Sequence, residues 1–177
     1  MDKLESAVAE HYGTVGLLAR IDAGLKTAGA DPAHPTPEDL AQVDEFHVGG
    51  RAATQHALSR MSLQASDHVL DVGCGLGGAA RYIASVFGCR LTGIDLTPDN
   101  IDVAQALTAR LGLSDSVRFE TASALSMPFE DATFDAAISF HVAMNIPDRD
   151  GLYREIARVL RPGATFCLYD VMKTGPG

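Results

Sequence analysis

The sequence predicts an α/β protein built on a doubly wound, mostly parallel sheet. From residue 67 onward, short apolar runs rich in valine and isoleucine alternate with stretches of helical periodicity. A glycine-rich turn at residues 73–78 joins the first of these apolar runs to the first helix. Strands that alternate with helices pair in parallel, and right-handed crossovers place the helices on both faces of the sheet.

The first 66 residues are expected to form a helical region ahead of the sheet. Thr36 suits the N-cap of a helix, and Pro37 suits its first position. Gly13 and Gly16 are expected to bend or break the helix that precedes it, and a glycine turn at residues 46–50 separates the last two helices. The predicted helices cover residues 3–28, 37–45 and 51–62.

The remaining residues supply the sheet and its crossovers. Thr97 is expected to cap the second crossover helix, and a turn is expected at residues 161–163. The third helix starts at Asp148 or Asp150. A sheet that stops after its fifth strand leaves an open edge, which a partner chain or a second copy could cover. The predicted strands are 68–72, 90–96, 116–121, 134–140 and 164–170, and the predicted helices are 79–87, 98–111 and a third ending near 160.

Composition and charge argue against several classes of partner. The chain has 177 residues, 46% hydrophobic and 21% charged, which suits one globular domain with a short appendage. Its net charge of −9, without any run of lysines or arginines, argues against nucleic acid and against an anionic membrane surface. No apolar stretch approaches the roughly 18 residues that span a bilayer, and the acidic N-terminus is not expected to be a signal peptide.

The cysteines point to a reducing compartment. Cys74, Cys89 and Cys167 lack the spacing of a zinc site, so we expect no metal. An odd number of cysteines within core-like segments suits the cytosol, and a cytoplasmic location is expected.

The glycine turn carries the first functional signal. Gly73, Gly75 and Gly78 match G-x-G-x-x-G, a pattern shared by several nucleotide-binding families. Asp95 lies 22 residues after Gly73, at the end of the second strand. A carboxylate there can accept hydrogen bonds from both ribose hydroxyls of an adenosine. The turn and Asp95 together indicate an adenosine-containing ligand.

Asp71 discriminates between such ligands. It lies two positions before the first glycine, inside the expected pocket. A carboxylate there would repel the pyrophosphate of a dinucleotide. S-adenosylmethionine carries no phosphate and offers a positive α-amino group and a sulfonium, so Asp71 favours it.

Four segments, in this order, resemble the class I S-adenosylmethionine-dependent methyltransferases. They read VLDVGCGLGG, LTGIDLT, FDAAISFHVAMNIPD and LYREIARVLRPGATFCLYDV. Within that class, the chain is similar over about residues 40–172 to the small-molecule methyltransferases of the UbiE and sarcosine/dimethylglycine type. The resemblance implies a Rossmann-like core at residues 67–177, without the sixth and seventh strands usual in the class, behind a helical lid at residues 1–66.

The resemblance also implies a cofactor-binding set, beginning at the methionine end. It places Asp71, Gly73 and Gly75 around the methionine part of S-adenosylmethionine, with Cys74 as backbone lining. His141 follows the fourth strand, where the chain passes the same end of the cofactor.

The other end of the set would hold the adenosine. Asp95 is implied to bind the ribose, and Leu96 to pack against the adenine. Related enzymes often carry an acid after the third strand, near the adenine amino group. This chain has Ser123 and Ala124 there, and a serine hydroxyl accepts a hydrogen bond more weakly than a carboxylate.

Methyl transfer is an in-line displacement, so the acceptor needs a free lone pair. His141 and His47 are the candidates to take a proton from it near neutral pH. The competing interpretations are a cofactor-wall role for His141 and, for His47, a lid residue that packs or hydrogen-bonds to the backbone. The small-molecule acceptor, methylated at nitrogen, oxygen or carbon, is not identified by the sequence. The residues expected in the lid or near the substrate are Tyr12, His47, Gly49, Gly50 and Asn145.

Two alternative functions stay open at this point. A nicotinamide-dependent oxidoreductase would share the fold and Asp95, but Asp71 and the long helical region disfavour it. The Tyr-x-x-x-Lys pair of such enzymes is matched only by Tyr169 and Lys173, and Lys173 lies beyond the last predicted strand. The second alternative is a cofactor-binding module without turnover, because strands and substrate loops of the class are missing. A longer natural parent chain, or a homo-oligomer through the open sheet edge, would reconcile this module with an enzyme.

Overall fold

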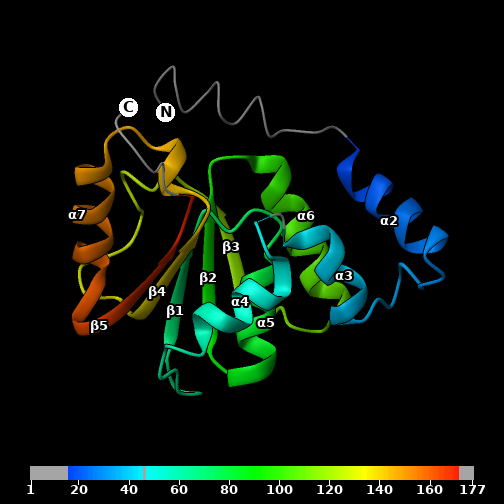
Figure 1. Ribbon diagram of the computed structural model, residues 1–177, viewed down its shortest axis with the longest axis horizontal. Coiled ribbons are helices and arrows are strands. Elements are labelled where there is room, and N and C mark those ends of the chain that lie inside the picture. Colours follow the sequence, from blue (N-terminus) through cyan, green and yellow to red (C-terminus); the bar gives the residue numbers. More distant parts are fainter. Residues whose placement is uncertain (1–15, 46, 172–177) are drawn as a thin grey trace.

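The computed structural model describes residues 16–45 and 47–171 (Figure 1). Its centre is a five-stranded, all-parallel sheet in the order β3-β2-β1-β4-β5. The chain runs outward from β1 to β3 and then returns to β4 on the other side of β1. This reversal defines the switch point of a doubly wound sheet, as the sequence predicts. The strands are β1 His68–Val72, β2 Arg90–Asp95, β3 Val117–Thr121, β4 Phe134–Phe140 and β5 Leu160–Tyr169.

Helices cover both faces of this sheet. The helices are α2 Leu17–Thr27, α3 Pro37–Asp44, α4 Gly50–Leu58, α5 Gly78–Phe87, α6 Pro98–Arg110 and α7 Arg149–Val159, with a short 3₁₀ helix at Ala143–Asn145. Alternate residues of β1 enter opposite cores: Val69 packs with α4, α5 and α6, whereas Leu70 packs with α7. Both side chains are fully buried.

Two of the helices that precede the sheet, α2 and α3, pack toward α6, whereas α4 packs against β5 and α3. Ile21 and Leu25 of α2 and Leu40 of α3 form a third core with Val103 and Leu107. In Figure 1 this part lies at the far end of the molecule from α7. The helical region therefore extends the layer on the α6 side of the sheet.

The helix boundaries near the N-terminus follow the predicted signals. Gly16, with φ 76°, is the N-cap of α2, where a break is predicted; the part of the predicted helix before Gly16 lies outside the described residues. The Thr36 side chain accepts a hydrogen bond from the backbone N–H of Asp39, whose carboxylate accepts from the backbone N–H of Thr36 in return. This reciprocal capping box fixes the start of α3.

Three local predictions are wrong. The helix predicted at residues 51–62 ends at Leu58, where Ser59 starts a turn that brings Met61 into the core. Thr97 occupies the N-cap of α6, but its side chain makes no capping hydrogen bond. The Asp95 carboxylate accepts from the backbone N–H of Thr97 instead, at 2.9 Å.

The third error concerns residues 161–163, which lie inside β5 rather than in a turn. Leu160 already pairs with Phe134, whereas the next pair joins Thr165 to Ala136. The residues between them bulge out of the ladder, and Gly163 has a φ of 84° there.

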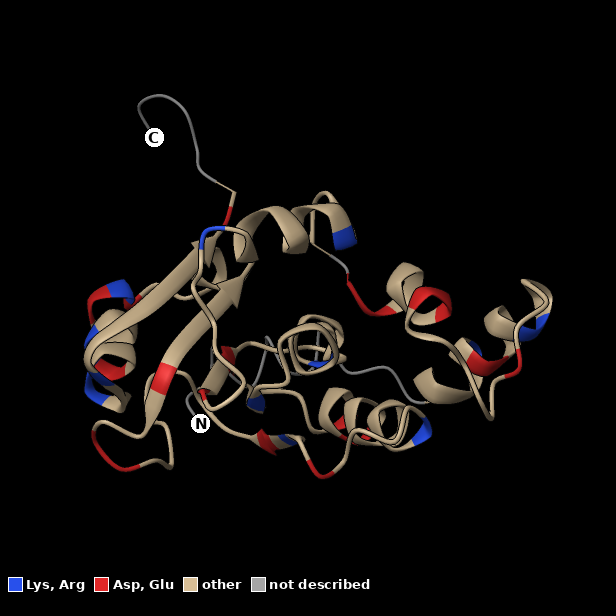
Figure 2. Ribbon diagram, turned by 90° about the horizontal axis from the view of Figure 1, so that it is seen from below, with Lys and Arg blue, Asp and Glu red and all other residues tan. Residues whose placement is uncertain are grey.

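Charged residues are dispersed over the described surface. Figure 2 shows lysines and arginines interspersed with acidic residues along the helices and outer turns. Within the described residues, no helix combines the length and apolarity needed to cross a membrane.

Candidate functional site

A cavity of about 760 Å³ lies at the carboxyl ends of β1, β2 and β4, at the switch point of the sheet. Its walls come from α2, from the end of α3, from the glycine turn after β1 and from the segments that follow the strands. This is the place where open parallel sheets bind ligands. Its volume suits a nucleoside-sized molecule.

The glycine turn forms the floor of this cavity, and residues 71–78 are called the cradle below. The backbone N–H groups of Gly73 and Cys74 both donate to the carbonyl of Ile94, at 2.8 and 2.9 Å. A Cβ at Gly73 would lie 2.3 Å from the Val142 side chain, whereas a Cβ at Gly75 would meet no atom within 4 Å. Gly73 is thus required for packing, and Gly75 leaves open space where a ligand can reach the backbone.

Asp71 lies in the cradle with an unsatisfied carboxylate oxygen. Its side chain is buried, with 3% exposed, and its Oδ2 has no hydrogen-bond partner among the described residues. Burial, together with the nearby Asp95 carboxylate, raises the pKa of Asp71 to about 7. A buried polar atom without a partner is costly and rare. Asp71 therefore marks a position where a cationic or hydrogen-donating group would be favourable.

Asp95 ties the cradle to the end of β2. Its Oδ2 accepts from the backbone N–H of Gly75 at 3.0 Å, and its Oδ1 accepts from Thr97. Asn100 donates to the same Oδ1 at 3.4 Å. Asp95 and Leu96 line the cavity, and Ser123 and Ala124 line it from the segment after β3. The Ser123 hydroxyl also accepts from the backbone N–H of Leu125.

A second group of side chains reaches the cavity from the end of α3. Asp44, Glu45 and His47, called the strap below, all line the cavity. Asp44 is buried against α5: a Cβ at Gly78 would lie 2.6 Å from the Asp44 carbonyl oxygen. Glycine at this position is what lets the strap approach the first turn of α5.

A buried arginine joins the strap to the cradle. Nη2 of Arg81 donates to the Asp44 carboxylate at 2.7 Å and to the Leu76 carbonyl at 2.6 Å. Nη1 donates to the Ala104 carbonyl and to the Thr108 hydroxyl of α6. Both charged side chains are at most 3% exposed. Burial raises the pKa of Asp44, and the Arg81 charge opposes that rise.

The other strap residues interact with α4. Glu45, whose side chain is fully buried, pairs with Arg51 and accepts from the Thr54 hydroxyl at 2.6 Å. The guanidinium of Arg51 also stacks over the Tyr82 ring, 4.7 Å from its centroid. Nε2 of His47 lies 3.0 Å from Thr54 Oγ1. Burial is the main reason that the pKa of His47 is lowered.

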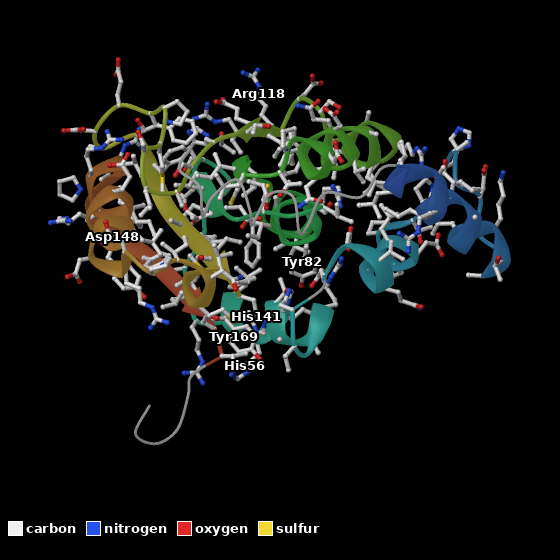
Figure 3. All side chains as sticks on the ribbon, turned by 90° about the horizontal axis from the view of Figure 1, so that it is seen from above. His56, Tyr82, Arg118, His141, Asp148 and Tyr169 are labelled. Carbon is white, nitrogen blue, oxygen red and sulfur yellow. The ribbon has the colours of Figure 1, made fainter. Side chains whose placement is uncertain are left out.

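Three aromatic rings gather around the ring of His47 in the strap. The His47 ring centroid lies 5.5 Å from that of Phe140, 6.0 Å from His141 and 6.2 Å from Tyr169. Figure 3 shows His141 and Tyr169 next to each other, and their centroids are 5.3 Å apart. His141 has a φ of 58°, which is uncommon for residues other than glycine, and its backbone N–H donates to the Tyr169 carbonyl. The structure thus brings both candidate histidines to one wall.

Most of the residues singled out from the sequence line the cavity. Gly49 and Gly50 are not in the lining; they lie at the start of α4, where Gly49 has a φ of 85°. Tyr12 lies outside the described residues. No group of three or more metal-ligating side chains occurs within residues 16–45 and 47–171. The predicted residues in the lining are His47, Asp71, Gly73, Cys74, Gly75, Asp95, Leu96, Ser123, Ala124, His141 and Asn145.

The family resemblance implies that residues 44–51 fold over the cofactor as part of a lid, but sequence reasoning missed the individual roles of the two acidic strap residues and their partners. Asp44 and Glu45 were not singled out, nor was Arg81, which supports the cavity from behind. A signal was available for Arg81: it lies among buried alanine and isoleucine residues on the apolar face of α5. Arginine on such a face is rarely fully buried unless it is paired. Other missed lining residues are Leu17, Arg20, Asn100 and Asp148.

Comparisons with known proteins agree on one family. A family model described as "Methyltransferase domain" matches residues 70–168. Sterol 4-C-methyltransferase strm-1 of Caenorhabditis elegans is 40% identical over 119 residues, which are 67% of this chain and 35% of that protein. Methyltransferase GfsG of Streptomyces halstedii is 34% identical over 137 residues, 77% of this chain and 49% of that protein. The chain thus spans half or less of the length of these two relatives.

A solved structure extends the comparison to most of the chain. The [4+2]-cyclase SpnF superposes with a TM-score of 0.70 at 27% identity, covering 91% of this chain and 58% of that one. The two proteins therefore share a fold over most of the length of this chain.

Proposed function

This chain belongs to the S-adenosylmethionine-dependent methyltransferase family, and from that premise we propose that it binds S-adenosylmethionine in the cavity above the cradle. Within the whole protein it would transfer the methyl group to a small-molecule acceptor, at nitrogen, oxygen or carbon. The observation that carries the proposal is the buried, unpartnered Oδ2 of Asp71.

Asp71 separates this ligand from a dinucleotide. The α-amino group and the sulfonium of S-adenosylmethionine are positive, and either would compensate a buried carboxylate. A pyrophosphate would add negative charge beside Asp71, whose pKa is already raised by burial and, to a smaller extent, by the charge of Asp95. The chemistry of this donor set therefore fits S-adenosylmethionine and disfavours a nicotinamide dinucleotide.

The rest of the cavity supplies the other contacts in this proposal. Gly73 and Gly75 would face the methionine part, Asp95 the ribose hydroxyls, and Leu96 the adenine. When bound, S-adenosylmethionine supplies a methyl group on a positively charged sulfur, already activated for displacement. The protein then contributes alignment and exclusion of water, which account for much of the rate in such reactions.

We assign deprotonation of the acceptor to a histidine among the four clustered rings. His47 and His141 are the candidate proton acceptors, and Asn145 could orient a polar group of the substrate. A histidine is suited to this role because its pKa lies near neutrality.

The proposal extends to the arrangement of the chain. Residues 1–66 would act as a helical lid over a core formed by residues 67–177. We also propose that the chain forms a homo-oligomer through the β5 edge and that it is located in the cytoplasm. The location is supported by the three free cysteines, Cys74, Cys89 and Cys167.

Calorimetric titration tests the ligand. We expect S-adenosylmethionine and S-adenosylhomocysteine to bind, and NAD(H) and NADP(H) not to bind. Tight binding of a nicotinamide dinucleotide without binding of S-adenosylmethionine would overturn the proposal.

Methyl transfer needs its own test, because one solved structure with this fold is named a cyclase. The chain would be incubated with S-adenosylmethionine and a panel of small amines, phenols and sterols, and release of S-adenosylhomocysteine would be followed. Binding without release, both for this chain and for the whole protein, would favour a cofactor-binding module.

A further inference from the structure

His47 has two hydrogen-bond partners, and both are on the same ring nitrogen. Nε2 lies 3.0 Å from the backbone carbonyl oxygen of Gly50 and 3.0 Å from Oγ1 of Thr54. A carbonyl oxygen can only accept a hydrogen bond. In the neutral ring, Nε2 must therefore carry the hydrogen.

The Thr54 hydroxyl imposes the same requirement independently. A hydroxyl has a single hydrogen to donate, and Thr54 donates it to Oε2 of Glu45 at 2.6 Å. Toward Nε2 of His47, the hydroxyl can then act only as an acceptor. Two partners from the start and middle of α4 thus select one tautomer, and the second ring nitrogen, Nδ1, keeps its lone pair. Among the described residues, no hydrogen bond reaches Nδ1.

The surroundings of the ring suit a group that takes up a proton and later releases it. Burial lowers the pKa of His47 most strongly and His141 lowers it slightly, whereas Glu45 and the hydrogen bond to Gly50 raise it; the net shift is downward, which favours the neutral ring. Oε2 of Glu45 lies 3.8 Å from Nε2, and its side chain is fully buried and paired with Arg51. A carboxylate at that distance stabilises the imidazolium formed when Nδ1 is protonated.

We infer that Thr54 and Gly50 hold His47 in its Nε2–H tautomer, so that Nδ1 is the atom that accepts the proton of the methyl acceptor. This role for Nδ1 rests on the proposed function. In the step, the O–H, N–H or C–H bond of the acceptor would break, its electron pair would stay on the oxygen, nitrogen or carbon, and the proton would move to Nδ1. An electron pair of that atom would form the bond to the methyl carbon, and the carbon–sulfur pair would stay on the sulfur. Thr54 and Glu45 act as positioning residues, because the Thr54 hydroxyl holds the His47 ring and the Glu45 carboxylate holds that hydroxyl.

The tautomer can be measured without any cofactor or acceptor. The chain would be labelled with ¹⁵N-histidine and its ring nitrogens observed by NMR at pH 8, with His47→Asn identifying the resonances. We expect a protonated, pyrrole-type Nε2 and an unprotonated, pyridine-type Nδ1. A pyrrole-type Nδ1 in the wild-type chain would overturn the inference, whatever the outcome of the cofactor titration. Failure of S-adenosylmethionine to bind would instead overturn the proposed function and leave the tautomer assignment standing.

Substitutions at Thr54 test its part in the selection. Thr54→Val keeps the shape and removes the hydroxyl, and we expect the tautomer ratio to shift about fivefold toward Nδ1–H, the effect of one lost hydrogen bond. Thr54→Ser keeps a hydroxyl and should restore the wild-type ratio. Thr92→Val is the matched control, because Thr92 contacts Nε2 of His68 at 2.8 Å and should leave the His47 resonances unchanged. An unaltered ratio in Thr54→Val would contradict the positioning role, and if that variant does not fold, Thr54→Ser and the wild type still decide the tautomer.

Discussion

The cradle at residues 71–78 and the strap of Asp44, Glu45 and His47 face the same cavity, but different forces hold them. The cradle is held by the backbone, through N–H groups of its glycine turn that donate to Ile94 and Asp95. The strap is held by buried charged side chains, Arg81 on Asp44 and Arg51 on Glu45. The comparison teaches that one wall is fixed by backbone hydrogen bonds at the ends of paired strands, whereas the other depends on buried ion pairs between side chains, one of which joins residues 37 positions apart.

Arg81→Met should have the largest effect, because Arg81 joins the two regions. It leaves the Asp44 carboxylate buried without its partner, and we expect the free energy of unfolding to fall by about 3–5 kcal/mol. Denaturant unfolding measures this. The matched control is Arg161→Met, because Arg161 pairs with Asp135 at an exposed site and its loss should cost about 1 kcal/mol or less. Equal losses in the two variants would show that the strap does not depend on its buried pair.

Asp71→Asn tests whether the cradle is built for charge. The pKa of Asp71 is raised from its usual 3.8 to about 7, so the folded chain keeps this carboxyl group protonated up to a higher pH than the unfolded chain does. The stability contributed by this proton is complete below pH 3.8 and is lost as the pH rises through 7. The wild type should therefore lose up to about 4 kcal/mol relative to Asp71→Asn between pH 4 and pH 8. Unfolding by denaturant across that range measures the difference. The variant should also bind S-adenosylmethionine about a hundredfold more weakly by calorimetry, the effect of one hydrogen bond to a charged group. Parallel pH profiles for the two chains would contradict the assignment.

Substitutions at two glycines of the cradle should separate the effect of packing on stability from the effect on cofactor binding. Gly73→Ala combines a positive φ with a clash against Val142, so we expect a loss of about 2–3 kcal/mol, seen as a lower melting temperature. Gly75→Ala meets only the backbone strain, about 1 kcal/mol, but its methyl group enters the open space of the cavity. Cofactor affinity should therefore fall at least about tenfold, or about 1.4 kcal/mol, in Gly75→Ala. Unchanged affinity there would place the ligand elsewhere.

Thr36→Ala should have the smallest effect and bears on the strap alone. It removes the capping box of α3, the helix that ends in Asp44, and should cost about 1 kcal/mol of stability. Thr27→Ala is the control, since the Thr27 hydroxyl only bonds back to the carbonyl of Ala23. Thermal melts of both variants measure the difference, and a loss in Thr36→Ala no larger than in Thr27→Ala would show that the cap does not support the strap.

The cradle could be predicted from the sequence because its signals are local. Gly73, Gly75 and Asp71 lie within five residues of each other, and Asp95 ends the next strand, so a strand–turn–helix pattern places them together. Parallel pairing then brings the ends of β1 and β2 to one edge of the sheet. All of this follows from short-range rules.

The strap could not be predicted in the same way. Asp44 and Arg81 are 37 positions apart, and nothing in either local pattern indicates that their side chains meet. Glu45, Thr54 and His47 form one network only because α4 folds back on the end of α3. The bulge at residues 161–163 was missed for a related reason: Pro-Gly favours a turn locally, but pairing of Leu160 with Phe134 keeps the segment in the sheet.

The position of β1 in the sheet has a consequence for folding kinetics. β1 pairs with β2 about twenty residues away and with β4 some seventy residues away, as in the pair of Val69 with Ala136. Closing the longer loop is the slower step, since non-local pairing delays folding. Because His141 and Val142 follow β4, the cavity is complete only after that step. A ligand bound there should therefore slow unfolding of the chain and leave its folding rate unchanged.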